Sequence, residues 1–336
     1  MTIFPVQFST LRMDALQQYV HEKYDLAGFS WHYIQRGASG DAYRLEKDNT
    51  RFFFKVYRHN HRSPEEIKAE IQLLDILQQQ GANVVYALKD NTGNTIQTFA
   101  APEGERCAVL FTFAAGARAG ITLTDEQLAA IGVVMARNHL ITQDLQLAYP
   151  RPEYNIHTTV HEPLRVLQAA LTGYGCTTEY RQLADTAPLV LEKLAKLCPE
   201  QFSTGYCHFD YFPHNYYFRD DNTVTLFDFD FSGKGYLVYD IATLFAHYEI
   251  VMYLQRITPE EGRRAMELLL ASYRKIKPLP AAEEAAIPLL AWMLLLFYLQ
   301  FQHESYEYYS HTYFNRKFIQ DRVAFMQHLA AKYEVI

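Results

Sequence analysis

The chain is poor in cysteine and has no clustered basic residues. Its four cysteines lie far apart and form no C-x-x-C pair, which excludes a recognisable zinc motif or disulfide framework and predicts a reducing, cytoplasmic setting. Lysine and arginine total 31 against 38 acidic residues, giving a net charge of −7, and they form no run. We therefore expect no nucleic acid partner, because the acidic balance suits cationic or neutral small molecules better.

Targeting and membrane-spanning patterns are also missing from the sequence. The N-terminal residues 1–24 carry recurring polar side chains and lack the basic start and apolar stretch of a signal peptide. The most apolar stretch, residues 285–299, contains Pro288 and falls short of the roughly 20 residues that a membrane-spanning helix needs. We therefore expect a buried core helix there and no membrane partner.

What remains is an ordinary globular composition of 336 residues, 49% hydrophobic and 21% charged. Hydrophobic periodicity divides the chain into two lobes. The β-rich lobe, residues 1–112, has expected strands at 31–34, 42–45, 52–57, 84–88, 95–99 and 108–113 and helices at 9–24 and 64–80. The mainly helical lobe, residues 113–336, has expected helices at 125–140, 163–171, 186–197, 259–275, 281–302 and 315–333 and a β-like island at 206–231. The pattern predicts a two-lobed α+β fold.

The β-like island holds the densest group of residues that can carry chemistry. It reads CHFDYFPHN from residue 207 and TLFDFDF from residue 225. On a strand, the period of two would place Asp228 and Asp230 on one face. Two carboxylates among aromatic side chains repel and lose solvation unless a cation compensates them, and Asp228 with Asn215 offers the sparse oxygen ligation that Mg²⁺ accepts. The alternative is a strand end with solvent-exposed aspartates.

The order of polar residues in the island is that of the kinase-fold phosphotransferases. Here the sequence resembles the aminoglycoside phosphotransferase and choline kinase family, whose loop reads H-G-D-x-H-P-x-N. The resemblance implies a protein-kinase-like fold in which Asp210 is the catalytic base and His208 braces the loop. It also implies that Asn215 and Asp228 bind a metal ion, with Asp230 as a second metal ligand or a substrate contact.

The loop departs from the family pattern at three positions. Phe209 stands where the family usually has glycine, Phe212 where it often has histidine, and His214 where glycine is frequent. Further along, Asp240 resembles the aspartate of the family's D-L-A element, and residues 131–139 resemble its L-G-x-x-L-A-x-x-H helix. We expect both to serve structure, with Asp240 capping a helix or bracing the loop.

The β-rich lobe provides an independent check. Lys55 lies inside the apolar run FFFKVY, and a lysine in such a place needs a partner. On the following helix, Glu70 falls on the apolar face, three residues after Ile67 and four before Leu74. The two residues have the form of the kinase Lys–Glu pair, in which the lysine positions nucleotide phosphates. The alternatives are a lysine that reaches the strand edge and a glutamate at the rim of the helix face.

Two further segments stand where such folds bind ATP. Gly37, Ser39 and Gly40 lie in a turn that precedes the lysine strand, and their backbone N–H groups are candidates for phosphate binding. A hairpin turn requires the same residues, so the turn alone does not decide between the two roles. Phe111 and Phe113 occupy the connection between the lobes, where chain order and the family resemblance place adenine.

The phosphate acceptor is less clearly marked. Residues 297–314 are rich in aromatic side chains interleaved with histidine and glutamate, and members of the resembled family bind the acceptor with this part of the chain. Tyr298 and Glu304, together with Glu249, are candidate substrate contacts, because aromatic faces and carboxylates suit an amine or a sugar ring. Packing in the hydrophobic core is the alternative interpretation for each aromatic residue.

The sequence thus predicts an ATP- and Mg²⁺-dependent phosphotransferase that acts on a hydroxyl of a small molecule such as an aminoglycoside, an amino alcohol or a sugar. A Ser/Thr protein kinase on the same scaffold is one alternative, but the twelve residues from Asp228 to Asp240 leave little room for a peptide-docking loop. A nucleotide-binding pseudokinase is another, against which the presence of Asp210 argues. The acceptor, the preference for ATP over GTP and the oligomeric state stay open.

Overall fold

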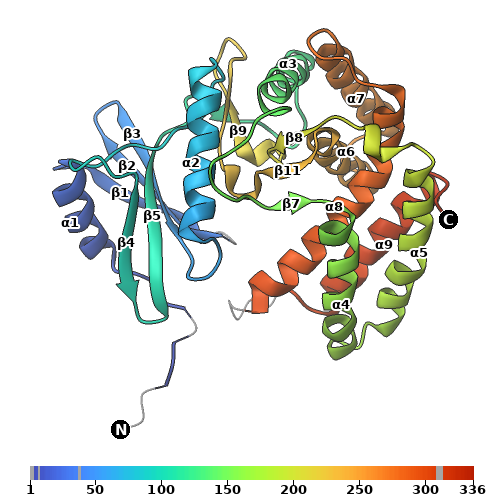
Figure 1. Cartoon of the computed structure of the whole chain (residues 1–336), viewed down its shortest axis with the longest axis horizontal. Helices are drawn as coiled ribbons and strands as arrows, with labels where there is room; N and C mark the ends of the chain where they lie inside the picture. The colour runs from blue at the N-terminus through green and yellow to red at the C-terminus, as the bar shows by residue number, and fades with distance from the viewer. Residues whose placement is uncertain (1–3, 7, 37–38, 308–312) are drawn as a thin grey trace. The chain divides into compact units, whose positions relative to one another are not determined.

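The computed structural model describes residues 4–6, 8–36, 39–307 and 313–336 (Figure 1). The chain divides into two compact units. The first comprises Met1–Ala115 and Leu147–Arg151, and the second comprises Gly116–Gln146 and Pro152–Ile336. The first unit is built on a β-sheet and the second is mainly helical, so the predicted α+β fold class is confirmed. The assignment of nucleotide binding to residues 1–112 and of catalysis to residues 113–336 stays a prediction.

The first unit holds one antiparallel sheet of five strands in the order β1-β2-β3-β5-β4. The strands are β1 (Ser30–Arg36), β2 (Gly40–Lys47), β3 (Thr50–Tyr57), β4 (Ile96–Ala101) and β5 (Gly104–Thr112), and the helices are α1 (Met13–Tyr24) and α2 (Pro64–Gln79). The strand expected at 84–88 is wrong, because this segment forms isolated bridges in place of a continuous strand, one of them between Ala87 and Phe111. The pairing of β4 with β5 ends at Val109. On that side of β5, only residues 110–112 remain for another segment to pair with.

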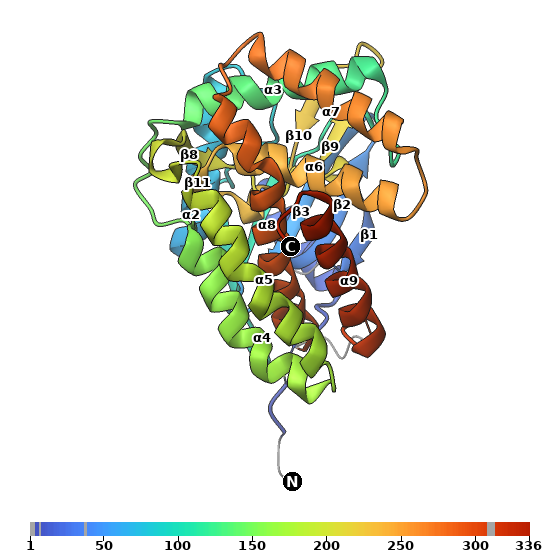
Figure 2. The same cartoon turned by 90° about the vertical axis from the view of Figure 1, so that its right-hand side faces the viewer.

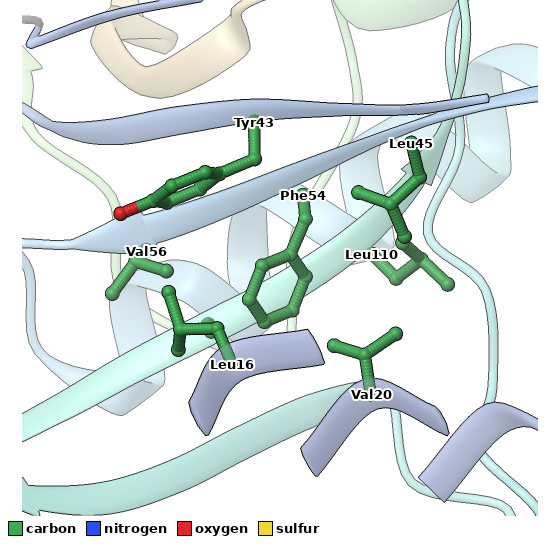
Figure 3. Packing of buried hydrophobic residues seen from close by; sticks show 8 residues of the cluster. Leu16, Val20, Tyr43, Leu45, Phe54, Val56 and Leu110 are labelled. Carbon is green, nitrogen blue, oxygen red and sulfur yellow. The ribbon is translucent and has the colours of Figure 1, made fainter. Parts of the chain in front are cut away.

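Helix α1 covers one face of this sheet (Figure 3). Its Leu16 and Val20 are buried against side chains from three strands. Those side chains are Tyr43, Leu45, Phe54, Val56, Ala108 and Leu110. Because side chains alternate along a strand, Phe54 on this face places Lys55 on the opposite face, where Figure 1 shows α2. The strand pattern therefore turns Lys55 toward the side of the sheet that α2 covers.

A capping box defines the start of α2. The hydroxyl of Ser63 accepts a hydrogen bond from the backbone nitrogen of Glu66, whose carboxylate accepts one from the backbone nitrogen of Ser63 in return. Pro64 occupies the first helical position, where its missing N–H group is not needed. The buried face of α2 includes Glu70 among its apolar residues, as the helical spacing predicted.

The second unit is mainly helical. Its helices are α3 (Asp125–Thr142), α4 (Glu162–Gly173), α5 (Thr177–Ala195), α6 (Val238–Tyr253), α7 (Pro259–Arg274), α8 (Ala281–Glu307) and α9 (Arg316–Lys332). Helix α3 packs against α7 and α6 against α8, while α4 and α5 lie along α8 and α9 (Figure 2). Helix α6 was not predicted, because nearly all of its side chains are buried and no polar face marks its period.

Two small sheets complete the second unit, with the strand orders β10-β9-β6 and β7-β11-β8. The strands are β6 (Ala117–Arg118), β7 (Glu153–Tyr154), β8 (Thr204–Cys207), β9 (Tyr216–Phe218), β10 (Val224–Leu226) and β11 (Gly233–Tyr236). Of these strands, β8, β9 and β10 belong to the predicted β-like island. The island is therefore split between two sheets, and the loop from β8 to β9 crosses from one to the other.

Helix α8 is longer than the sequence suggested. It has 27 residues, and its segment Ala281–Ser305, with a mean hydropathy of 1.6, is long and apolar enough to meet the criteria for a membrane span. The expectation that this stretch is too short is therefore wrong. In the structure more than half of its apolar window is buried, and Leu290, Trp292 and Leu296 are almost completely covered. In this structure α8 is a core helix of the second unit.

Candidate active site

The loop between β8 and β9 carries Asp210, and both oxygens of its carboxylate have hydrogen-bond partners. The side-chain nitrogen of Asn215 donates to Oδ2 of Asp210 at 2.6 Å and to its carbonyl oxygen at 2.9 Å. The hydroxyl of Tyr298, on α8, lies 2.9 Å from Oδ1. Residues from the loop itself and from a distant helix therefore hold the carboxylate in one orientation.

The surroundings of Asp210 favour its protonated form more than water would. Burial raises the pKa of the Asp210 carboxyl, and the nearby carboxylate of Asp228 raises it further. The charges of His214 and His208 and the hydrogen bond from Tyr298 lower this pKa, but burial outweighs them. A carboxylate whose pKa is raised is a better proton acceptor at neutral pH than an exposed one.

The backbone of the Asp210 loop is held by one buried carboxylate. Asp240, in the first turn of α6, accepts hydrogen bonds from the backbone nitrogens of His208 at 3.1 Å and Phe209 at 2.7 Å. Its Oδ2 also lies 3.1 Å from Nε2 of His139 on α3. Nδ1 of His139 lies 2.7 Å from the hydroxyl of Tyr273, so the imidazole can donate to Asp240 through Nε2 and accept from the tyrosine through Nδ1. As predicted, Asp240 braces the loop.

The imidazole of His208 provides a second brace. Its Nε2 lies 3.0 Å from the carbonyl oxygen of Phe227, just after β10, and therefore carries the proton that is donated to this acceptor. The ring also packs on Phe229, with the ring centroids 4.4 Å apart. These contacts tie the Asp210 loop to the segment that carries Asp228.

Phe209 stands at the family's glycine position with a glycine-like backbone. Its φ is +63°, in the left-handed region that side chains other than glycine rarely adopt. The buried ring stacks on Tyr154 with 3.4 Å between the ring centroids, and it meets Tyr239 and Phe297 edge to face. We infer that these aromatic contacts, which lie next to the candidate base, offset the strain in the backbone of Phe209.

The strand expected across residues 224–231 is shorter than predicted. Strand β10 ends at Leu226, and the chain turns at Asp228, whose φ is +60°, into the 3-10 turn Phe229–Phe231. Asp228 is exposed, whereas Asp230 is buried. The prediction that the two carboxylates share one strand face is wrong, because the chain leaves the extended conformation at Asp228.

A metal ion held by Asn215 and Asp228 would be coordinated by oxygen atoms. The backbone nitrogen of Phe227 donates to the carbonyl oxygen of Asn215 at 3.0 Å, so Asn215 and Asp228 lie at the same end of the β9–β10 hairpin. Because the side-chain nitrogen of Asn215 is bound to Asp210, its amide oxygen is the atom available to a cation. Within the described part of the chain, no group of three His, Cys, Asp or Glu side chains could hold a metal. Such sparse oxygen ligation fits Mg²⁺, which keeps water and phosphate ligands.

Lys55 and Glu70 meet at one tyrosine of the first unit. Both side chains are buried. Nζ of Lys55 lies 4.8 Å from the centroid of the Tyr57 ring, and the hydroxyl of Tyr57 donates to Oε2 of Glu70 at 3.3 Å. The structure therefore brings the predicted lysine and glutamate to the same place on the sheet face that α2 covers. Their role in nucleotide binding stays a prediction.

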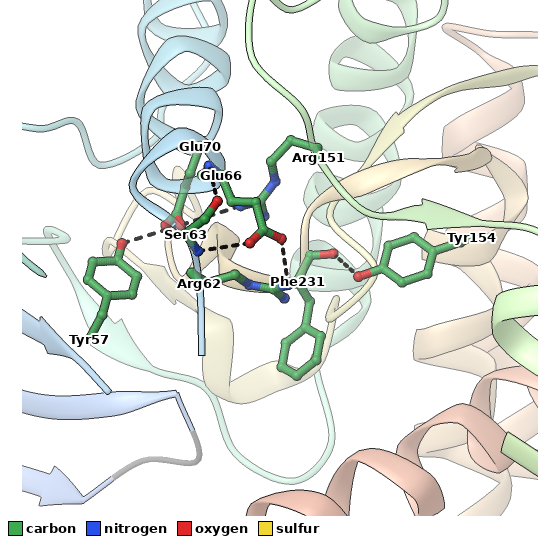
Figure 4. Close-up of polar contacts among 8 residues, drawn as sticks. All are labelled: Tyr57, Arg62, Ser63, Glu66, Glu70, Arg151, Tyr154 and Phe231. Carbon is green, nitrogen blue, oxygen red and sulfur yellow. Dashed lines mark hydrogen bonds and ion pairs between the residues drawn. The ribbon is translucent and has the colours of Figure 1, made fainter. Parts of the chain in front are cut away.

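Arg151 is a contact of Glu70 that the sequence did not reveal. Its guanidinium is fully buried and lies 3.8 Å from Oε2 of Glu70 (Figure 4), and its Nη1 donates to the carbonyl oxygen of Glu66 at 3.1 Å. In the same segment the backbone nitrogen of Ala148 donates to the side chain of Gln72 at 2.8 Å. The segment Leu147–Arg151 thus lies along α2, a contact between distant parts of the sequence that no local pattern marks.

We expect Arg151→Met to loosen α2. A hydrogen bond from a charged donor contributes about 1.5–3 kcal/mol, so the amides of α2 should exchange with deuterium roughly 10- to 100-fold faster. Hydrogen exchange followed by mass spectrometry would measure this. Lys68→Met is the matched control, because Lys68 forms an exposed pair with Glu65 on the same helix and should change exchange little. Equal rates in the two variants would contradict the expectation.

The turn predicted to bind phosphate is only partly described. Gly37 lies outside the described residues. The carbonyl oxygen of Ser39 accepts a hydrogen bond from the backbone nitrogen of Arg58 at 3.1 Å. A Cβ atom on Gly40 would stand 2.4 Å from the carbonyl oxygen of Val56, so the close approach of β2 and β3 requires glycine at this position. Phosphate binding by this turn stays a prediction.

The candidate adenine contacts lie at the end of the sheet. Phe111 is buried in β5 opposite Phe53 of β3, and Phe113 follows the last residue of β5 and is half-buried. The burial of Phe111 agrees with a role in packing. Contact of either ring with adenine stays a prediction.

The three candidate acceptor contacts have different surroundings. Tyr298 lies at Asp210. Glu249, on α6, is buried and accepts hydrogen bonds from Nζ of Lys332 at 2.7 Å and from the hydroxyl of Tyr333 at 2.8 Å, so its carboxylate ties α6 to the end of α9. Glu304 is exposed on α8, and residues 308–312 of the aromatic-rich stretch lie outside the described residues. Substrate contacts by Glu249 and Glu304 stay predictions.

The kinase-like fold and the Asp210 loop define a phosphotransferase, and comparison with known proteins agrees. The model of the phosphotransferase enzyme family, APH, matches residues 30–285. The chain belongs to this family, so the predicted resemblance is confirmed. It is a kinase of the class that acts on small molecules.

Relatives with curated sequences span most of the chain. An uncharacterized protein of Deinococcus radiodurans is 30% identical over 293 residues, which cover 85% of this chain and 80% of the relative. A homoserine kinase of Xanthobacter autotrophicus is 25% identical over 267 residues, which cover 78% of this chain and 76% of the relative.

Solved structures share the fold over almost the whole chain. A microcompartment-associated aminopropanol kinase has a TM-score of 0.75 at 22% identity, covering 96% of both chains. An amicoumacin kinase, solved with AMP-PNP and Ca²⁺, has a TM-score of 0.73 at 17% identity, covering 96% of this chain and 94% of the other. At these identities the likeness concerns the fold, and the second structure shows that this fold accommodates an ATP analogue.

Proposed function

We propose that this protein uses ATP and Mg²⁺ to transfer the γ-phosphoryl group to a hydroxyl of a small molecule. One observation carries the proposal: the carboxylate of Asp210 is fixed by Asn215 and Tyr298 in a loop that keeps the histidine, aspartate and asparagine of the family's catalytic loop in the same order. In this role Asp210 orients the acceptor hydroxyl and takes its proton as the new bond to phosphorus forms.

The other site residues would serve the nucleotide and its metal ion. Asn215 and Asp228 would hold Mg²⁺, which offsets the negative charge of the phosphates. In the first unit, Lys55 would contact the α- and β-phosphates, with Glu70 orienting the lysine. The AMP-PNP present in the related amicoumacin kinase supports a nucleoside triphosphate as the phosphoryl donor.

Amino alcohols are the first acceptors to test. The names of two similar proteins, a homoserine kinase and an aminopropanol kinase, refer to small molecules that carry both an amine and a hydroxyl. The aromatic side chains near Asp210 suit an ammonium group through cation–π contacts. Phe212 and Phe231 lie within 6 Å of the Tyr298 ring, measured between ring centroids.

A product screen by mass spectrometry tests the proposal. The purified protein is incubated with ATP and Mg²⁺ and with amino alcohols, aminoglycosides, sugars or a protein mixture, and EDTA is added to a parallel set. We expect one class of small molecule to gain the mass of one phosphoryl group, and the gain to be lost with EDTA. Phosphorylated protein in place of a phosphorylated small molecule would favour a protein kinase. Bound ATP that is never consumed would favour a pseudokinase, and either result would overturn the proposal.

A further inference from the structure

One phenol group contacts both the candidate base and the backbone of its loop. The hydroxyl oxygen of Tyr298 lies 2.9 Å from Oδ1 of Asp210 and 2.8 Å from the carbonyl oxygen of Phe209. Both distances fit hydrogen bonds, but a phenol has only one proton to donate. The hydroxyl therefore has two acceptors within reach and can serve one of them at a time.

We propose that Tyr298 is a positioning residue for Asp210, because its hydroxyl lies within hydrogen-bond distance of both the candidate base and the backbone of the loop that carries it. The inference deepens the proposed function and rests on it. While Asp210 is ionised, Tyr298 donates to Oδ1 and aligns the carboxylate through a charge-assisted hydrogen bond.

The atoms of this cycle balance without any further reagent. The acceptor oxygen forms its bond to the γ-phosphorus while the bond from this phosphorus to the bridging oxygen of ADP breaks. The acceptor O–H bond breaks, and its proton goes to the Asp210 carboxylate, which passes it to water after the product leaves. Tyr298 keeps its own proton throughout.

Packing alone would not require the hydroxyl. The Tyr298 ring lies in an aromatic cluster, with its centroid 5.9 Å from that of Phe212 and 5.7 Å from that of Phe231. Phenylalanine preserves these contacts and removes only the hydroxyl group. The variant Tyr298→Phe therefore separates positioning from packing.

A double-mutant cycle tests the inference, using the acceptor found in the product screen. We expect Tyr298→Phe to lower kcat about 10- to 100-fold, the equivalent of one hydrogen bond to a charged group, with the KM values for ATP and acceptor within about twofold of wild type. In the Asp210→Asn background, which has no carboxylate to align, the same substitution should change the residual rate less than about twofold.

Tyr154→Phe is the matched control. The hydroxyl of Tyr154 also donates to a backbone carbonyl, that of Phe231, at 2.5 Å (Figure 4). Any effect of losing this bond on kcat should be the same in both backgrounds, because the bond does not involve Asp210. Thermal unfolding of each variant verifies that it is folded.

Three outcomes would overturn the inference. Tyr298→Phe could keep the kcat of wild type, or it could lower the rate by the same factor with and without Asp210. A raised KM for the acceptor at unchanged kcat would instead make Tyr298 a substrate contact. None of these results touches the proposed function, which fails only if the wild-type protein itself transfers no phosphate to a small molecule.

Discussion

Replacing Asp210 with asparagine should lower kcat by about 10²- to 10⁴-fold, the usual contribution of a positioned general base. Asparagine has nearly the same shape, so the loop and the nucleotide site should be preserved. Its amide takes up no proton at neutral pH, and its nitrogen would face either Asn215 or Tyr298. Steady-state kinetics with the identified acceptor would measure the loss, and titration calorimetry would show that ATP still binds.

Asp125→Asn is the matched control for this experiment. Asp125 begins α3 and forms an exposed ion pair with Arg264, so the substitution should leave kcat unchanged. Near-normal turnover by the Asp210 variant would mean that another group accepts the proton, and the assignment of the loop would then fail.

Among the proposed substitutions, Asp240→Ala should lower the free energy of unfolding the most. The change leaves the backbone nitrogens of His208 and Phe209 without their acceptor, inside a buried loop. Each buried donor left without an acceptor costs about 1–3 kcal/mol, and His139 loses its acceptor as well. We therefore expect the free energy of unfolding to fall by about 3–5 kcal/mol, measured by urea denaturation.

Asp321→Ala provides the comparison for Asp240→Ala. Asp321 pairs with Lys317 on the exposed face of α9, and such pairs contribute less than about 1 kcal/mol. If the two substitutions lowered the free energy of unfolding equally, the carboxylate of Asp240 would not be the brace of the loop.

Local patterns in the sequence were enough to place two polar residues of the first unit, Lys55 and Glu70. Lys55 stands out because it interrupts an apolar strand, and Glu70 because it lies on the apolar face of an amphipathic helix. Both signals arise from the period of the element, which the side chains on either side define. In the structure both residues lie at Tyr57. Tyr57 follows Lys55 by two positions on β3 and therefore faces the same side of the sheet, the side that α2 covers.

Other features of the site left no local trace. The alternation of aspartate and phenylalanine after β10 looked like a continuing strand, but the backbone of Asp228 is left-handed, and alternation cannot reveal a turn that aspartate tolerates. The contacts of Tyr298 with Asp210 and of Arg151 with Glu70 join residues that are 88 and 81 positions apart. Contacts of this kind depend on how whole elements pack, which no window of sequence records.

Because Leu147–Arg151 belongs to the first unit, the two units do not correspond to two consecutive segments of the chain. A single cut after residue 115 would yield a first fragment that lacks Arg151, the buried cation beside Glu70. Recombination between relatives at that point would pair the α2 helix of one parent with the arginine segment of the other. Exchange of the first unit would therefore have to carry two separate stretches of sequence, and residues on α2 and in 147–151 should change together as the family diverges.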